Sequence, residues 1–207
     1  APEEFSGGSE LGSLAHWVLA HENYYERLED LLHNKENISR IPGYLRGIWR
    51  NEKSKSLLEG WLKNFAVSEL GLMLRKQKDL QQEYRFRRNL NEKITLAGSI
   101  DAFFGGNNVV DYKITSIDNV PPGLYQSQLE FYAFIVHELT GAEKVNTFIV
   151  FLREGKVETR TYDNFAEIQA RIMKSAEICA SGPYNPNHEH CGSCPFKKGC
   201  VKIAGKF

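Results

Sequence analysis

The sequence predicts an α/β domain in which helices flank a central sheet, with a helical N-terminal half and a C-terminal cysteine loop. Three observations support this prediction: apolar residues recur at helical spacing up to about residue 77, the period changes to two near residue 80, and all four cysteines follow residue 178. The chain has 207 residues, of which 42% are hydrophobic, enough for one compact domain with an appendage. We expect one domain over residues 1–182 and a cysteine-bearing tail over 183–207 that packs on it.

Two long helices are predicted in the N-terminal half. In the first, over residues 9–32, apolar side chains from Leu11 onward recur at helical spacing. In the second, over residues 54–77, leucines and aromatic residues form a wide apolar face. Pro42 breaks the helical pattern between them.

Strands are predicted after residue 80. Over residues 82–87, polar and aromatic side chains alternate, which predicts a strand. Residues 94–104 can form a second strand, and a turn at 107–108 precedes a short apolar strand at 109–110. We therefore expect a three-stranded meander. The chain then continues with a helix over 124–139, strands over 145–152 and 156–162, and a helix over 163–180.

The charge balance excludes a strong general attraction to polyanions. Lysine and arginine total 26, aspartate and glutamate total 26, and only local basic clusters could bind nucleic acid or an anionic membrane. No apolar run approaches the ~20 residues of a membrane span, and the N-terminus lacks the pattern of a signal peptide. We expect a cytoplasmic protein, and the start at Ala1 suggests a domain of a longer chain.

Two aspartates and a lysine form the most informative group. Asp101 lies near the middle of the second predicted strand, while Asp111 and Lys113 end the third, so antiparallel pairing can bring the two carboxylates together. Carboxylates are ligands that Mg²⁺ or Mn²⁺ prefers, and a lysine beside them can stabilise charge on a phosphate oxygen. Two carboxylates and a lysine arranged in this way suit metal-assisted hydrolysis of phosphodiester bonds.

The same three residues have an ordinary alternative interpretation. An aspartate and a lysine two positions apart are common on exposed strand faces, where they contribute little. Here, however, Val109 and Val110 lead directly into Asp111. A charged residue in a half-buried strand needs a partner or a metal, which favours the functional interpretation.

Four motifs of the chain resemble those of one family. They are LGSLAH followed by Leu19 (residues 11–19), GSID (98–101), DYK (111–113) and QLEFY (128–132). In this order they are similar to motifs of the RecB-like branch of the PD-(D/E)XK nucleases, found in AddAB (AddB- and AddA-type) and RecBCD helicase–nucleases and in CRISPR-associated exonucleases. The tail CGSCPFKKGC is similar to the cysteine pattern of the iron–sulfur members, so the resemblance covers nearly the whole chain.

The resemblance implies a restriction-endonuclease-like core with a central mixed sheet, and a role for each matching residue. The metal ligands would be His16, Asp101, Asp111 and the backbone carbonyl of Tyr112. Lys113 would be the catalytic lysine, and Gln128 and Tyr132 would face the site from their helix and position it or the DNA strand. A lone histidine such as His16 is otherwise typical of a core position. Glu83, on the preceding strand, could reach the site or could pair with the arginines near it.

The cysteines predict a metal or iron–sulfur site rather than disulfides in a reducing compartment. They are Cys179, Cys191, Cys194 and Cys200. A [4Fe–4S] cluster needs four thiolates, and in the proteins that the tail resembles the fourth precedes the first helix, where this chain has none. The cluster would then be incomplete, unless Cys179 substitutes. Zinc bound with His188 or His190 is an alternative, as is an empty loop with Cys179 buried in its helix.

The function that follows is that of a metal-dependent DNA nuclease domain, an exonuclease rather than an endonuclease, within a helicase–nuclease of double-strand break repair. Its partners would be single-stranded DNA or duplex ends and a helicase domain or subunit. Two alternatives stay open: a stand-alone CRISPR-type or phage exonuclease, and a catalytically inactive DNA-binding scaffold with an iron–sulfur staple.

Phosphate contacts could come from several basic clusters, each of which could equally be a solvated face. The cationic candidates are Arg46, Arg50, Lys53, Lys55, Arg75, Lys76, Lys78, Lys197 and Lys198. Trp49, Tyr44 or Tyr125 could stack on unpaired bases.

Overall fold

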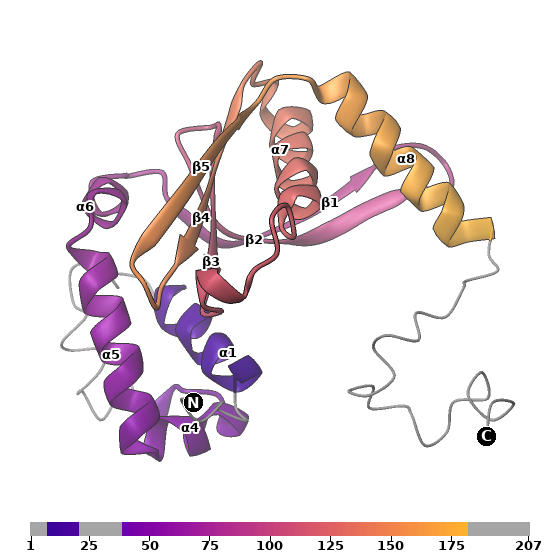
Figure 1. Ribbon diagram of the computed structural model, residues 1–207. Coiled ribbons are helices and arrows are strands. Elements are labelled where there is room, and N and C mark those ends of the chain that lie inside the picture. Colours follow the sequence, from indigo (N-terminus) through magenta and orange to yellow (C-terminus); the bar gives the residue numbers. More distant parts are fainter. Residues whose placement is uncertain (1–7, 21–38, 182–207) are drawn as a thin grey trace, which may run out of the picture. The chain divides into compact units, whose positions relative to one another are not determined.

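The computed structural model describes residues 8–20 and 39–181 (Figure 1). The chain divides into two compact units, residues 1–169 and residues 170–207. The first unit holds the sheet and all the residues of the candidate site described below. The last helix, α8 (Phe165–Ser181), begins in the first unit and continues into the second.

A five-stranded mixed sheet forms the centre of the first unit, in the order β1-β2-β3-β4-β5. The strands are β1 (Gln81–Asn89), β2 (Thr95–Phe104), β3 (Asn108–Lys113), β4 (Val145–Phe151) and β5 (Lys156–Tyr162). Neighbouring strands are antiparallel except β3 and β4, which are parallel because the helix α7 (Gln126–Thr140) connects them. The predicted mixed sheet with flanking helices is therefore confirmed.

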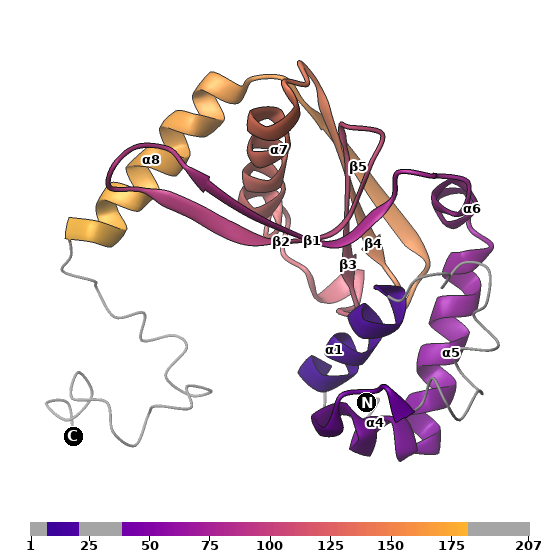
Figure 2. The same ribbon diagram turned by 180° about the vertical axis from the view of Figure 1, so that it is seen from behind.

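Helices cover the two faces of the sheet. Successive side chains of β3 point to opposite faces, and they contact different helices. Tyr112 is buried in a core formed with the N-terminal helices, whereas its neighbours Asp111 and Lys113 hydrogen-bond Gln128 of α7. The N-terminal helices are α1 (Gly8–Leu19), η1 (Gly43–Leu45), α4 (Arg46–Arg50), α5 (Glu52–Ala66) and α6 (Glu69–Arg75). Figures 1 and 2 label α1, α4, α5 and α6 of this group, which lie near one another in both views. The site residues thus come from both layers.

The predicted single helix over 54–77 is wrong, because the chain breaks into α5 and α6 at Val67 and Ser68. The Ser68 hydroxyl accepts a hydrogen bond from Gly71 N at 3.1 Å and donates one to Phe65 O at 2.7 Å. A Cβ on Gly71 would lie only 2.1 Å from that same Phe65 oxygen. The break therefore combines an N-cap with a close approach that only glycine permits.

Other predicted boundaries shift by a few residues. β3 runs over Asn108–Lys113 rather than 109–110, and α7 begins at Gln126 rather than 124. The first predicted helix is present as α1 up to Leu19, and its continuation over 21–32 lies outside the described residues. Within the described ranges, no helix combines the length and the apolar character that crossing a bilayer requires.

The β1–β2 hairpin extends beyond the rest of the sheet, since β2 pairs with β3 only through residues 102–104. In the extended part, Phe86 lies opposite Gly98, and a Cβ on that glycine would come within 2.8 Å of the Phe86 ring. The ring also contacts Phe131 of α7, with the two centroids 5.7 Å apart. Gly98, the first residue of the GSID motif, is thus needed for the hairpin to pack on α7.

Candidate metal centre and active site

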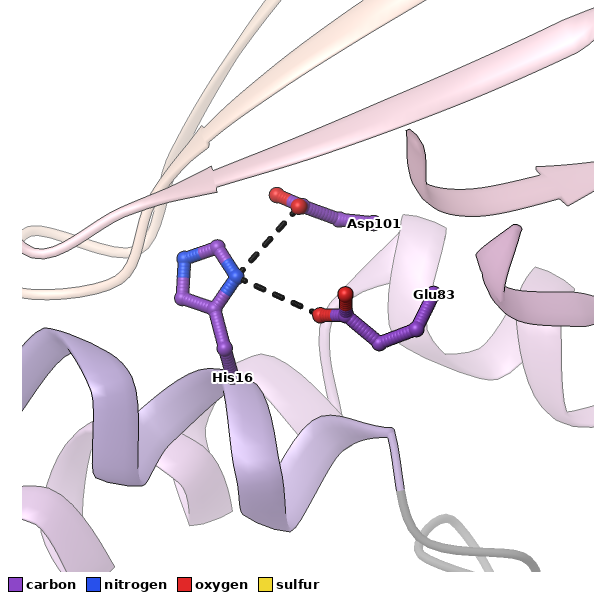
Figure 3. A group of neighbouring side chains, drawn as sticks. All are labelled: His16, Glu83 and Asp101. Carbon is purple, nitrogen blue, oxygen red and sulfur yellow. Dashed lines mark ion pairs between the residues drawn. The ribbon is translucent and has the colours of Figure 1, made fainter. Parts of the chain in front are cut away.

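Three side chains from three elements meet at the point where the hairpin leaves the sheet. His16 of α1 lies with its Nδ1 3.3 Å from Asp101 Oδ1 and 3.7 Å from Glu83 Oε1. Figure 3 marks these two ion pairs with dashed lines. One ligand atom from each residue lies within 4.8 Å of the others. An imidazole nitrogen and two carboxylates at this spacing suit a divalent cation such as Mn²⁺ or Mg²⁺.

Tyr112 joins this group through its backbone. Its N–H donates to Asp101 Oδ2 at 2.8 Å, and its carbonyl oxygen lies 3.1 Å from His16 Nε2. The Tyr112 ring is buried and packs edge-on against Phe65, with centroids 5.5 Å apart. Burial of the ring therefore holds the carbonyl beside the histidine, so the sequence-predicted ligands His16, Asp101 and Tyr112 do come together.

Asp111, the remaining predicted ligand, lies in a second group with Lys113 and the α7 residues. Lys113 Nζ is 2.7 Å from Asp111 Oδ2 and donates to Gln128 Oε1 at 3.2 Å. The Gln128 amide in turn donates to Asp111 Oδ1 at 3.1 Å and to the Tyr132 hydroxyl at 3.0 Å. Gln128 thus bridges the aspartate, the lysine and the tyrosine that the sequence motifs predicted for the site.

Burial gives Asp111 the chemistry of a carboxylate that needs a cation. Its side chain is 2% exposed, and burial raises its pKa to about 6, an effect to which the negative charge of Asp101 adds. The positive charge of Lys113, whose Nζ lies 2.7 Å from Oδ2, opposes this rise in the pKa. Oδ2 is fully buried and accepts no well-aligned hydrogen bond within the described structure, although Lys113 Nζ is close. A divalent cation near Asp101 would stabilise both carboxylates.

The two carboxylates beside His16 change its pKa. Burial alone would lower the pKa of His16, but hydrogen bonds and charges from Asp101 and Glu83 outweigh it and raise the value to about 10. The hydrogen bond to His16 is the largest effect on Glu83, and it lowers the pKa of that carboxyl against the opposing effect of burial. Without a metal, the protonated His16 ring is the cation beside the two carboxylates. A bound metal would have to displace the proton from this ring, because only neutral imidazole coordinates a metal.

Glu83 is the residue whose place the sequence left open. Its φ of 48° is positive, an unusual conformation for a non-glycine residue, and it lies opposite Asp101 at the one gap in the β1–β2 ladder. Ser99 Oγ donates to Glu83 Oε2 at 3.1 Å and helps to orient it. The pairing of residues across the hairpin was the signal that could have placed Glu83 next to Asp101.

Several side chains that could have contacted nucleic acid have internal roles instead. Tyr125 lies under Lys113, whose Nζ is 4.7 Å from the ring centroid, and packs against Phe151. Trp49 is only 5% exposed, so its ring is not available to stack on a base. The Arg46 guanidinium donates to the carbonyls of residues 39 and 41 and so stabilises the chain before η1.

The predicted iron–sulfur site lies mostly outside the described residues, which include only Cys179 of the four cysteines. Cys179 is exposed on α8, so the expectation that its side chain is buried in the helix is wrong. Cys191, Cys194 and Cys200 lie in the range 182–207, which the structure does not describe.

Comparisons with known proteins agree with the geometry. The profile of the PD-(D/E)XK nuclease superfamily matches residues 1–201. A crystal structure from Eubacterium rectale, of a protein named "Putative exonuclease", is similar at a TM-score of 0.60 and 15% identity, over 100% of this chain and 81% of that one. The structure of SSO0001 gives a TM-score of 0.43 at 17% identity, over 95% and 96% of the two chains. A search of curated proteins finds no match.

Proposed function

Because the chain belongs to the PD-(D/E)XK nuclease superfamily, we propose that it is a metal-dependent deoxyribonuclease that acts as an exonuclease. The observation that carries this proposal is the position of Lys113, held between Asp111 and Gln128. The name of the similar Eubacterium rectale protein supports the exonuclease mode. The RecB-like motifs at residues 11–19, 98–101, 111–113 and 128–132 support a place in a helicase–nuclease of double-strand break repair.

His16, Asp101, Asp111 and the Tyr112 carbonyl would hold the divalent cation, and Glu83 is a further donor of the same kind. The donor set fits Mn²⁺ and Mg²⁺, because it combines carboxylate and carbonyl oxygens with one imidazole nitrogen. When bound, the cation supplies Lewis-acid polarisation of the scissile phosphate.

The side chains around Lys113 would prepare it for phosphoryl chemistry. Its side chain is 18% exposed, so the ammonium can face a phosphate oxygen while Asp111 and Gln128 fix its position. A charge fixed in a partly dry site stabilises negative charge that develops during hydrolysis without further reorganisation. Tyr132 accepts a hydrogen bond from Gln128, and its own hydroxyl proton can donate toward the substrate.

The direct test is cleavage of a labelled single-stranded DNA with Mn²⁺, Mg²⁺ or EDTA. We expect cleavage with metal only, and a loss of at least roughly a hundredfold in Lys113→Ala, because removal of one fixed electrostatic donor typically costs that much. Mn²⁺ binding measured by calorimetry should persist in this variant, since an ammonium is no metal ligand. Lys144→Ala is the matched control, because it removes an exposed lysine just before β4, at the end of the strand opposite the row that contains Lys113. Undiminished cleavage by Lys113→Ala would refute the proposal.

A further inference from the structure

The β1–β2 hairpin has one face that is already occupied by packing. Beyond the candidate metal centre, Phe86 lies over Gly98 and contacts Phe131 of α7. On the same side, Arg88 is neutralised by Glu138 of α7, with Arg88 Nη2 3.2 Å from Glu138 Oε2. Since side chains alternate along a strand, the intervening residues of β1 lie on the other face.

The other face of the hairpin carries two arginines that, unlike Arg88, are not paired with a carboxylate within the described residues. Arg85 lies opposite Ser99, and Arg87 lies opposite Ala97. Both arginines are exposed, and neither makes a hydrogen bond or an ion pair with any residue in the described ranges. We call these four residues, Arg85, Arg87, Ala97 and Ser99, the open hairpin face.

The open hairpin face is continuous with the candidate metal centre. Ser99 belongs to it and donates its hydroxyl hydrogen bond to Glu83, which lies 3.7 Å from His16. Arg85 is also close enough for its charge to add to the larger effect of His16 in lowering the pKa of Glu83. A chain that lies on this face therefore leads directly to the cluster of carboxylates.

We propose that the open hairpin face binds the phosphate backbone of single-stranded DNA and guides it to the metal centre, an inference that rests on the proposed nuclease function. Side chains two positions apart on a strand repeat every ~7 Å, a spacing that adjacent phosphates of an extended strand can match. Guanidinium groups bind phosphate with paired N–H donors, and their contacts with a backbone carry no base specificity.

A single strand fits this path better than a duplex. The Asp101 and Asp111 side chains are only 12% and 2% exposed, so the scissile phosphate has to approach two largely buried carboxylates closely. A flexible single strand can bend toward these carboxylates without the unstacking and unpairing that a duplex would require. The open hairpin face is only two strands wide, which also suits one backbone rather than two.

The test measures binding without catalysis, by fluorescence anisotropy of labelled oligo(dT) in EDTA and in Ca²⁺. In the double variant Arg85→Gln/Arg87→Gln we expect the dissociation constant to rise about tenfold. We also expect the magnitude of the negative slope of log K against log salt to fall by about 1.4, or about 0.7 for each phosphate that is no longer bound. A matched double variant, Lys144→Gln/Arg160→Gln, removes two exposed charges near the start of β4, away from the Lys113 row, and should leave the slope unchanged.

Each outcome decides the inference. Equal losses of affinity in the two double variants would mean a general charge effect and overturn the inference. Unchanged affinity in Arg85→Gln/Arg87→Gln would overturn it too, as would the absence of binding by the wild type. Cleavage with Mn²⁺ separates the two proposals. If the wild type cleaves but Arg85→Gln/Arg87→Gln binds normally, only the hairpin inference fails. If the wild type binds through the arginines but never cleaves, only the nuclease function fails.

Discussion

Glu83 combines a strained backbone with a carboxylate that faces a histidine and an aspartate. A positive φ at a non-glycine residue costs about 1–2 kcal/mol, and such strain persists only when the surrounding contacts enforce it. Its place opposite Asp101 suggests that the strain is kept for the carboxylate. In this conformation the carboxylate contacts His16 and accepts a hydrogen bond from Ser99.

We expect Glu83→Gln to weaken Mn²⁺ binding roughly tenfold, because it removes one negative charge beside the metal site but keeps the size of the side chain. Calorimetric titration with Mn²⁺ measures the change. Glu92→Gln, in the turn of the same hairpin, is the control and should bind Mn²⁺ like the wild type. Unchanged affinity in Glu83→Gln would reduce Glu83 to an ion-pair partner of His16.

The ring of Tyr125 should act through Lys113 rather than by stacking on DNA. A cation–π contact at 4.7 Å is worth about 1 kcal/mol when partly buried, so Tyr125→Leu should lower kcat roughly fivefold with little change in KM. Tyr125→Phe keeps the ring and should restore kcat. A rise in KM at constant kcat would instead mean that Tyr125 contacts the substrate.

Among the secondary-structure elements, the junction of α5 and α6 offers a matched pair of glycines. A Cβ on Gly71 would lie 2.1 Å from Phe65 O, whereas a Cβ on Gly60, exposed within α5, would meet nothing within 4 Å. Gly71→Ala should therefore lower the free energy of unfolding by about 2 kcal/mol, an ordinary cost of overpacking. Gly60→Ala should raise it by about 0.5–1 kcal/mol through helix propensity. Urea denaturation measures both, and equal effects would contradict the role of Gly71.

For the molecule as a whole, the cysteine tail determines whether a second kind of metal site is present. A cluster of the [4Fe–4S] type needs four thiolates, and Cys191, Cys194 and Cys200 supply three. We expect the chain to bind less than one equivalent of cluster after anaerobic reconstitution, measured as iron and sulfide. A stoichiometric cluster that is lost in Cys179→Ser would show instead that Cys179 is the fourth ligand, and bound zinc would favour the mixed site with His188 or His190.

Local patterns along the chain were enough to predict most of the helices and strands, and they selected Asp101, Asp111 and Lys113. The patterns could do so because hydrophobic period is a local property and because charges that interrupt apolar strands are visible in one dimension. His16 and Gln128 were assigned to the site only through the resemblance of their motifs to those of RecB-like nucleases. The sheet is mixed because one helix, α7, connects the parallel strands β3 and β4, and a helix in this place was also predicted.

Contacts between distant segments account for the features that these patterns could not predict. The conformation of Glu83 comes from hairpin pairing and from His16, which is 67 positions away in the chain. Tyr125 could be assigned to Lys113 only once α7 lay on β3. Register, close packing and the pairing of charges are set by the fold as a whole, so the pattern of residues along the chain does not contain them.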